Sequence, residues 1–538
     1  MSGGPSGDLD RMAMAVLQPG FEGTEPPDWL RRALADGLGG VVLFARNIAR
    51  NFDRDVGRNA DRKAGRGKAR DSARDAAALD GGRDEGHDDG LVSGLGATAA
   101  LVAELRRERP EVIVAVDEEG GAVTRLEAVT GSSWPGNMAL GVAGDESLTR
   151  QVARQIGRMV AAAGITLDYA PVVDVNADPR NPVIGVRSFG SDPGEVGRHG
   201  AAWIEGLQSA GVAACAKHFP GHGDTVTDSH LALPAVRASR EVIERRDLPP
   251  FRAAVAAGVR AVMCGHLLVP AVDVLPATLS RAVVTGLLRE ELGFGGLVVT
   301  DAIEMRAVAA LHPPGEIAVR ALAAGVDAIC VGVSSAAGES VYALRDAITA
   351  AVREGRLKEE RLAEAAGRVR DLAAWYDARA EARKAAARDA DEGLGLAAAT
   401  AALRATPAQP RRRPVLTRAP LVVRMAARPT QAVGRATPLT LGEAIGEILP
   451  GTVTAEVDED GRLPDLSETG RPVVISVHDA VRHAWMRGLL EAALRARPDA
   501  VVVETGVPGT PAGRLYLATH GASTASARAA ARWLTGGA

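Results

Sequence analysis

The stretch that decides the fold is Val212–His230, which reads VAACAKHFPGHGDTVTDSH. Its first five residues form a short apolar run, which predicts a buried strand. Proline and glycine then exclude a helix or a continued strand. A lysine, three histidines and two aspartates therefore lie on one loop beyond a strand end. Asp228 and His230 stand two residues apart, so a turn lets the carboxylate orient the imidazole, and this pair indicates catalytic machinery.

The composition limits the class of protein. The chain has 538 residues, 46% hydrophobic and 24% charged, which is ordinary for globular proteins. Because a single core stops growing at roughly 250–300 residues, we expect two domains. A net charge of −4 and 3% aromatic residues disfavour nucleic acid or an acidic membrane as a partner. The first residues contain no basic segment followed by an apolar run, so we predict a cytoplasmic protein without a membrane span.

The three cysteines carry no metal or disulfide signal. Cys215, Cys264 and Cys330 each lie in an apolar, strand-like run, and none has CxxC spacing. A disulfide framework or a zinc ribbon is therefore not expected. We interpret them as reduced, buried, small hydrophobic residues, and we expect neither a metal nor a cofactor.

Strand-length apolar runs alternate with helix-like segments over residues 11–375. The eight runs are Met12–Leu17, Gly40–Phe44, Val112–Val116, Ile165–Val175, Val212–Ala216, Arg260–Cys264, Leu297–Thr300 and Val326–Val331. Eight such strand–helix units predict an α/β fold with a TIM-like (β/α)8 barrel as the catalytic domain. The pattern alone leaves a doubly wound open sheet as the alternative.

Three further regions differ from the barrel pattern. Residues 51–90 mix both signs of charge and have almost no large apolar side chains, which predicts a disordered insertion. Residues 376–414 are rich in alanine, arginine and aspartate and predict a linker that contains a helix. Residues 415–538 predict a smaller α/β sandwich domain. Its expected strands are Leu421–Arg424, Val473–Val477, Val501–Glu504 and Leu515–Ala518.

Polar side chains lie at or just beyond the carboxyl ends of five consecutive strands of the predicted barrel. They are Asp117-Glu118-Glu119, Asp174, Lys217-His218, His266, and Asp301 with Glu304. The carboxyl ends of the strands carry the active site in barrels of this kind. A single residue of this type could be a helix cap or a turn carboxylate, but five consecutive strand ends together indicate a site.

Several segments resemble glycoside hydrolase family 3, in its branch of bacterial β-N-acetylglucosaminidases. Lys217–His230 resembles the signature KHFPGHG-x4-DSH of that branch. Four other segments resemble further blocks of the family in the same order, namely Gly40–Asn47, Val116–Leu126, Ile184–Gly190 and Val298–Met305. The resemblance covers most of residues 11–375 and implies a TIM-like barrel that cleaves amino-sugar glycosides. The charged insertion at 51–90 departs from the family pattern.

The resemblance also implies roles for single residues. Asp301 matches a nucleophile that forms a glycosyl-enzyme, although an aspartate here could instead be the N-cap of a helix over Ala302–Ala310. His230 matches the acid/base, with Asp228 as its orienting partner, and an imidazole suits this work because it titrates near neutrality. The sugar-binding positions implied are Asp117, Arg125, Arg187, Lys217 and His218.

The leading prediction is a retaining exo-β-N-acetylglucosaminidase that takes a small amino-sugar glycoside derived from peptidoglycan or chitin. A phosphorylase is a close alternative, because a histidine acid/base does not repel a phosphate anion as a carboxylate would. A metal-dependent hydrolase using His218, His222 and His230 is disfavoured, because the proline and glycines among them break a helix. A silent sugar-binding protein would have no need of the nucleophile and the acid/base pair together.

Overall fold

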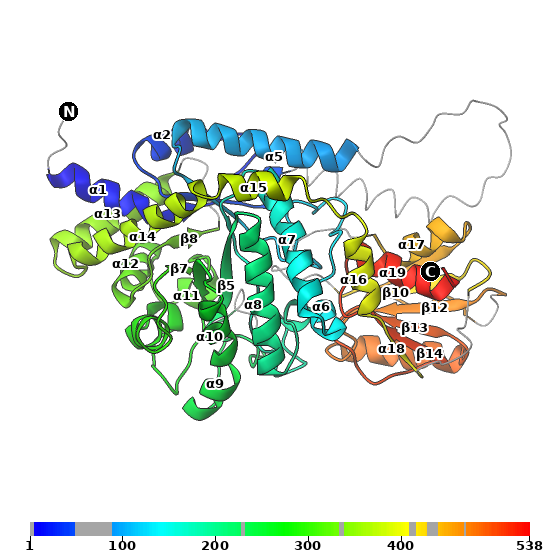
Figure 1. Cartoon of the computed structure of the whole chain (residues 1–538). Coiled ribbons are helices and arrows are strands. Elements are labelled where there is room, and N and C mark those ends of the chain that lie inside the picture. The colour runs from blue at the N-terminus through cyan, green and yellow to red at the C-terminus, as the bar shows by residue number, and fades with distance from the viewer. Residues whose placement is uncertain are drawn as a thin grey trace.

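A computed structural model describes residues 5–48, 89–227, 232–332, 338–407, 416–427, 439–466 and 470–537. Figure 1 shows a larger α/β body, coloured blue to yellow-green, beside a smaller one in orange and red. The insertion predicted at 51–90 lies outside the described residues except for its last two. Asp228 and His230 also lie outside them.

Eight short parallel strands form the centre of the larger body. They are β1 (Leu17–Pro19), β2 (Gly40–Leu43), β3 (Ile113–Val116), β4 (Leu167–Asp168), β5 (Ala213–Phe219), β6 (Ala261–Cys264), β7 (Leu297–Thr300) and β8 (Ile329–Val331). Strands β2 to β7 form one sheet in chain order, and β1 pairs with β8. A bridge from Val299 to Ala328 joins β7 to the segment before β8, and Gly39 N donates to Met14 O between the segments that lead into β2 and β1. This closed order confirms the TIM-like barrel and excludes the open-sheet alternative.

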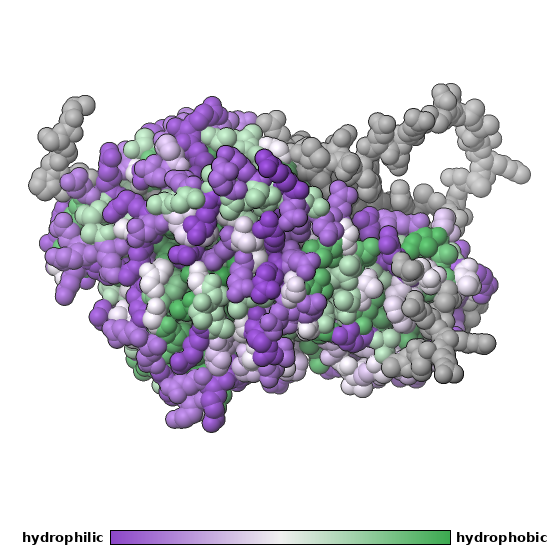
Figure 2. All heavy atoms as spheres, in the orientation of Figure 1, coloured by the Kyte–Doolittle hydropathy of each residue, from purple (hydrophilic) through white to green (hydrophobic). Residues whose placement is uncertain are grey.

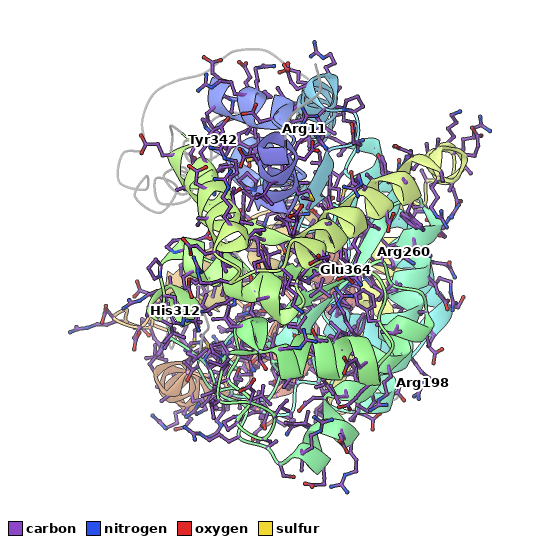
Figure 3. The ribbon with its side chains drawn as sticks, turned by 90° about the vertical axis from the view of Figure 1, so that its left-hand side faces the viewer. Arg11, Arg198, Arg260, His312, Tyr342 and Glu364 are labelled. Carbon is purple, nitrogen blue, oxygen red and sulfur yellow. The ribbon has the colours of Figure 1, made fainter. Side chains whose placement is uncertain are left out.

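Helices cover the outside of this sheet (Figure 1). Figure 3 shows Arg198 of α8, Tyr342 of α13 and Glu364 of α14 on this helical layer. On the face drawn in Figure 2, hydrophilic side chains cover most of the larger body, as expected for helices exposed to water. The helices are α1 (Pro5–Ala15), α2 (Asp28–Ala35), α3 (Ala45–Ile48), α5 (Asp89–Glu108), α6 (Asn137–Ala143), α7 (Glu146–Ala162), α8 (Pro193–Ser209), α9 (Arg240–Arg246), α10 (Leu248–Ala256), α11 (Arg306–Ala309), α12 (Pro314–Ala324), α13 (Glu339–Arg353) and α14 (Glu359–Asp377), with 3₁₀ turns η1 (Gly185–Arg187) and η2 (Ala277–Leu279) and the π-helix η3 (Ala282–Glu291).

Two predicted strands need correction. Most of Met12–Leu17 belongs to α1, and β1 begins only at Leu17, because a six-residue apolar run fits a buried helix as well as a strand. Ile165–Val175 supplies only the two-residue β4. Pro171 interrupts the rest, because proline has no N–H to give to a sheet ladder.

The smaller body is a six-stranded sheet between helices, which confirms the predicted sandwich domain. Its order is β11-β10-β12-β13-β14-β9, and only β9 runs antiparallel. Helices α17 and α19 pack on one face and α18 on the other. The strands are β10 (Leu421–Met425), β11 (Val453–Val457), β12 (Val473–Val477), β13 (Val501–Glu504) and β14 (Leu515–Ala518), and the helices are α17 (Leu441–Ile448), α18 (Ala484–Ala496) and α19 (Thr524–Thr535).

The segment 376–414, expected as a linker with a helix, contains more structure than that. Beyond the end of α14 it holds α15 (Ala380–Ala387), α16 (Leu394–Ala401) and β9 (Arg404–Thr406). Strand β9 pairs with β14, so this segment contributes to the second sheet. Residues 408–414 lie outside the described part.

All three cysteines are buried and none forms a disulfide. Cys215 and Cys330 lie inside the barrel beside Tyr169, and Cys264 faces the surrounding core. Burial raises the pKa of the Cys264 thiol to about 12, so this thiol stays protonated and unreactive near neutral pH. No helix in the described ranges is long and apolar enough to cross a bilayer.

Candidate active site

The carboxyl end of β3 turns sharply on two glycines. Gly120 and Gly121 have φ angles of +74° and +61°, a region that side chains disfavour. A Cβ atom on Gly121 would lie 2.5 Å from Cα of Gly136, so the turn also needs a residue without a side chain. This turn fixes Asp117 and Glu119 at the end of the strand.

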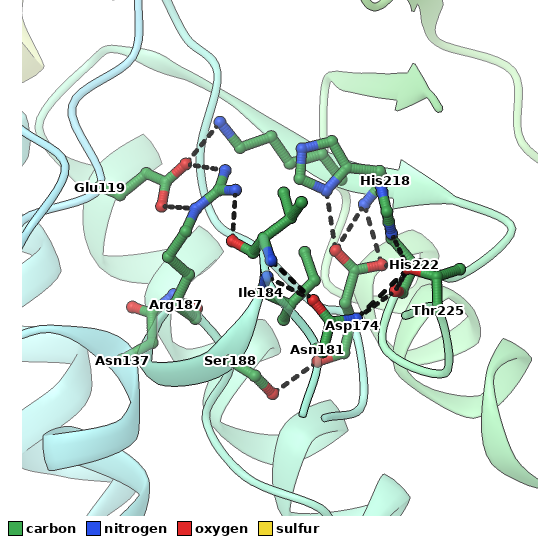
Figure 4. A network of polar contacts seen from close by, with 12 residues as sticks. Glu119, Asn137, Asp174, Asn181, Ile184, Arg187, Ser188, His218, His222 and Thr225 are labelled. Atoms are coloured by element: carbon green, nitrogen blue, oxygen red, sulfur yellow. Dashed lines mark hydrogen bonds and ion pairs between the residues drawn. The ribbon is translucent and has the colours of Figure 1, made fainter. Parts of the chain in front are cut away.

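Four charged side chains form one network at this end of the barrel, and Figure 4 shows its Glu119 and Arg187. Lys217, near the end of β5, donates from Nζ to Asp117 Oδ1 and lies at the same distance of 2.7 Å from Glu119 Oε1. Arg187, on η1, donates from Nε to Glu119 Oε2 at 3.0 Å and from Nη2 to Oε1 at 2.7 Å. Its Nη1 donates to the carbonyl oxygen of Val183 at 3.1 Å. Two cations thus balance two carboxylates, as burial requires.

The network keeps Glu119, Lys217 and Arg187 ionised. Burial would raise the pKa of Glu119, but the charges of Arg187 and Lys217 outweigh it and hold that pKa far below its usual value. Burial would lower the pKa of Lys217, but Asp117 and Glu119 together raise it. Burial opposes the charge of Arg187 too, yet Glu119 raises its pKa. These three side chains are therefore fixed full charges, already oriented before a ligand arrives.

Asp174, in the loop after β4, organises the loop after β5. It is fully buried, and its Oδ2 lies 2.7 Å from Nδ1 of His218. Its Oδ1 accepts a hydrogen bond from the backbone N–H of His222 at 2.7 Å. Burial would raise the pKa of Asp174, but the charge of His218 and these hydrogen bonds keep it below its usual value. Because the carboxylate is the acceptor, Nδ1 of His218 carries a proton and Nε2 faces away from this contact.

His222 serves this loop as an internal support. Its Nδ1 lies 2.7 Å from Thr225 Oγ1, and its carbonyl oxygen accepts from Asn181 Nδ2 at 2.8 Å. Burial, with the charge of His218, lowers the pKa of His222 to about 4, so the ring is neutral near pH 7. These contacts account for a histidine in this position without a catalytic role.

Asp301 follows β7 at the same end of the barrel. Its backbone N–H donates to the Cys264 carbonyl oxygen at 3.1 Å, and its Oδ1 accepts from the Ala302 N–H at 2.8 Å. Helix α11 begins at Arg306 with Met305 as its N-cap residue, so the alternative interpretation of Asp301 as a helix cap is wrong.

Asp117 follows β3 and Asp301 follows β7, so both carboxylates lie at the same mouth of the barrel. Burial raises the pKa of the Tyr169 phenol inside the barrel, and nearby groups that include Cys330, Cys215, Asp117 and Asp301 add to the effect.

The structure brings Asp117, Arg187 and Lys217 of the predicted set together. His218 follows Lys217 directly and contacts Asp174. Arg125 is half-buried in the loop after β3, where its backbone N–H donates to Glu118 Oε2 at 2.8 Å. The predicted set omitted Glu119 and Asp174, the carboxylates that organise the network and the loop. Their place just beyond strand ends was the only sequence signal for either.

A cleft between the two bodies opens beside this network. The barrel contributes Gly121, Thr124, Ser132 and the turn that carries Arg187, and the second body contributes residues 424–427, 476–479, 519 and 521–523 among others. In the second sheet the chain order reverses between β10 and β12, and crevices at such a switch point are common ligand sites in α/β sheets. The cleft is not lined by Asp301, Lys217 or Asp117. Arg187 therefore lies where the cleft meets the charged network. In the described part of the chain, no three His, Cys, Asp or Glu side chains are grouped to hold a metal ion.

The fold and the charged strand-end site define a barrel enzyme of the TIM-like class. The sequence model described as "Glycosyl hydrolase family 3 N terminal domain" matches residues 92–372. The chain belongs to glycoside hydrolase family 3.

Relatives give the branch of the family. "Beta-hexosaminidase A" of Pseudoalteromonas piscicida is 38% identical over 242 residues, which cover 42% of this chain and 40% of the relative. "Beta-N-acetylglucosaminidase/beta-glucosidase" of Cellulomonas fimi is 36% identical over 49% of this chain and 47% of its own length. The chain thus spans less than half the length of these two relatives. "Beta-hexosaminidase" of Pseudomonas aeruginosa PAO1 is 39% identical over 42% of this chain and 68% of the relative.

One solved structure matches both bodies. It is described as a glycoside hydrolase family 3 β-N-acetylglucosaminidase from Paenibacillus sp. str. FPU-7. The match has a TM-score of 0.80 and 33% identity, and it covers 98% of this chain and 96% of that one. The resemblance to the β-N-acetylglucosaminidase branch of the family is therefore confirmed.

Proposed function

We propose that this protein is a retaining exo-β-N-acetylglucosaminidase that forms a covalent glycosyl-enzyme on Asp301. The observation that carries the proposal is the hydrogen-bonded network of Asp117, Glu119, Arg187 and Lys217 at the mouth that also holds Asp301. The hexosaminidase names of relatives support the same substrate class. We propose amino sugars derived from peptidoglycan or chitin as the natural substrates.

The network suits the recognition of sugar hydroxyls and an acetamido group. Lys217 has three N–H donors and gives two of them to carboxylates, so one remains for a ligand. The Asp117 side chain is 23% exposed and can accept a hydroxyl hydrogen bond while it stays paired. Charge-assisted hydrogen bonds of this kind are about twice as strong as neutral ones. His218 offers its second ring nitrogen, and Arg125 is the remaining sugar-binding residue of the proposal.

The proposed reaction has two displacements. The Asp301 carboxylate attacks the anomeric carbon while His230 gives a proton to the departing glycosidic oxygen, and Asp228 holds the imidazole in orientation. His230 then takes a proton from water, whose oxygen attacks the anomeric carbon and releases the Asp301 carboxylate. The hydrogen bond from Ala302 N–H holds Oδ1 of the Asp301 carboxylate in place.

The test follows hydrolysis of p-nitrophenyl N-acetyl-β-glucosaminide by proton NMR, with and without inorganic phosphate. We expect the β-anomer of N-acetylglucosamine as the first product in both cases. Early α-anomer would refute retention. A sugar 1-phosphate formed only with phosphate would make the enzyme a phosphorylase with the same intermediate. Mass spectrometry of protein denatured during turnover of a slow substrate should find the sugar on the peptide that contains Asp301.

A further inference from the structure

The turn that carries Arg187 contacts the second domain. Arg187 stands on η1, a single turn in the loop between β4 and α8. Val186 of this turn is buried in one small apolar cluster with Met138 of α6 and Val507 of the second domain. A Cβ atom on Gly185 would lie 3.6 Å from Cγ2 of Val507, which is van der Waals distance. Val507 therefore rests directly on the turn that presents Arg187.

Val507 is itself held by a rigid loop arrangement. The buried carboxylate of Glu504, at the end of β13, accepts hydrogen bonds from the backbone N–H groups of Asp479 at 2.9 Å, Ala480 at 3.2 Å and Gly506 at 2.7 Å. Asp479 Oδ1 in turn accepts from Val507 N–H at 2.7 Å. A Cβ atom on Gly506 would lie 2.2 Å from Asp479 Oδ1, so only glycine permits this approach.

The backbone of this loop is strained where it meets the barrel. Asp479 has a φ of 55° and His520 a φ of 56°, and they are the only non-glycine residues with positive φ in the described ranges. Both follow the carboxyl ends of strands in the second sheet. Such conformations cost roughly 1–3 kcal/mol each and persist only where surrounding contacts enforce them. The hydrogen bonds to Glu504 enforce the positive φ of Asp479.

The second domain is also tied to the barrel near this contact. Thr524 Oγ1 donates to the Thr130 carbonyl oxygen at 2.8 Å, and Ala525 N–H donates to the Ser132 carbonyl oxygen at 3.4 Å. These bonds keep the loop of Val507 in register with the turn of Arg187.

We propose that Val507 is a positioning residue through which the second domain keeps Arg187 in its two-bonded contact with Glu119. The proposal rests on the proposed function, because that function assigns Arg187 to the sugar. The contacts run from Glu504 through Asp479 to Val507, then to Val186 and the Arg187 guanidinium. Val507 acts on the substrate only through Arg187.

The first test compares Val507→Ala with Val474→Ala. Both remove the same two methyl groups, but Val474 lies in the interior of the second domain and does not line the cleft. Val507→Ala should raise KM for the aryl N-acetylglucosaminide about three- to tenfold with less change in kcat, the size of coupling that packed side chains carry. Val474→Ala should lower the melting temperature at least as much and leave KM unchanged. Val507→Ile, which keeps a branched apolar side chain, should have a KM close to that of the wild type.

A double-mutant cycle decides between positioning and general destabilisation. If Val507 acts through Arg187, Val507→Ala should change kcat/KM little further in an Arg187→Lys background. Losses that multiply would overturn the proposal. Val186→Ala on the barrel side gives the same test if Val507→Ala does not fold.

Hydrogen exchange separates this inference from the proposed function. Amide exchange over residues 184–188 should speed up in Val507→Ala and not in Val474→Ala, whatever the enzyme hydrolyses. Unchanged exchange would refute the positioning role. A wild-type protein that releases no nitrophenol would refute the proposed function instead.

Discussion

The barrel and the second domain both place a buried glutamate at the carboxyl end of a parallel strand. In the barrel, Glu119 bonds to the side chains of Arg187 and Lys217. In the second domain, Glu504 bonds to three backbone N–H groups. The same side chain thus does two kinds of work. Pairing with cationic side chains builds a charged surface that a ligand can share, whereas pairing with backbone builds a scaffold.

The titration of the two glutamates follows their partners. Burial acts on both, but two cations hold the pKa of Glu119 well below the usual range. Burial raises the pKa of Glu504, because its backbone hydrogen bonds compensate the buried charge less than two cations would. A full negative charge is therefore assured on Glu119 at the barrel site and not on Glu504 in the scaffold.

The largest expected effect is on the barrel side. Asp301→Ala should lower kcat/KM by roughly 10⁴-fold or more, as removal of a covalent nucleophile does in other enzymes. Thermal unfolding should stay close to wild type, because this carboxylate is half-buried at the barrel mouth and not part of the core. Steady-state kinetics and a melting curve check both. Near-normal activity would place the nucleophile elsewhere.

The next effect depends on the leaving group. His230→Ala should slow substrates with a sugar alkoxide leaving group by about 10²–10⁴-fold, because general acid help has that size. Aryl substrates should suffer much less, because a nitrophenolate departs without a proton. Kinetics on p-nitrophenyl and disaccharide substrates measure the contrast, and Asp228→Asn should give a weaker version of it. Equal losses on both would make His230 a binding residue.

The same substitution in both domains tests the contrast between Glu119 and Glu504. Glu119→Gln leaves Arg187 and Lys217 with one carboxylate too few, so the free energy of unfolding should fall by about 3–5 kcal/mol and kcat/KM with it. Glu504→Gln keeps an acceptor oxygen and should cost only about 1–2 kcal/mol, with a few-fold rise in KM. Urea unfolding and steady-state kinetics on both variants give the answer. Similar losses of kcat/KM in the two variants would contradict the distinction between a charged ligand surface at Glu119 and a scaffold at Glu504.

The smallest effect concerns Glu118, a barrel glutamate of the scaffold kind. Its Oε2 accepts from the backbone N–H groups of Arg125 and Leu126. Burial, with the nearby charge of Glu127, raises its pKa to about 7. A raised carboxyl pKa means that the folded state favours the proton, so this stability is complete below about pH 4.5 and is lost as pH rises through about 7.

Glu118→Gln should remove that pH dependence. The loss in the wild type should be on the order of 3 kcal/mol at most, because one pKa unit corresponds to about 1.4 kcal/mol. Urea unfolding at pH 5 and pH 7.5 measures it, with Glu119→Gln as the control whose own contribution lies at more acidic pH. An unchanged slope in Glu118→Gln would assign the effect to another group.

The sequence predicts the fold best where burial on both faces demands β-branched residues. Leu297–Thr300 and Val473–Val477 coincide with β7 and β12 for this reason. Strand β11 was missed because four of its five residues are exposed or half-exposed, so it shows no apolar run. Strand β9 was missed for the same reason, since Arg404–Thr406 is an exposed edge.

The sequence predicts which residues belong to the site but not how they are arranged in space. Lys217, Arg187 and Asp117 follow from the motifs, and the structure joins them in one network. Glu118 and Glu119 are identical neighbours in the sequence, so no pattern tells which one faces the cations. The glycine turn after them decides it, and that depends on packing against Gly136.

Strand β9 has a consequence for how the chain could be divided. A fragment that begins at residue 415, where the composition suggests a new domain, would lose Arg404–Thr406 and leave β14 with unpaired backbone groups along its edge. It would also lose α16, whose Ala399 packs against Ala525 and Ala529 of α19. Bare strand edges recruit other chains, so we expect such a fragment to aggregate. A soluble second domain should instead begin before α16, near residue 390.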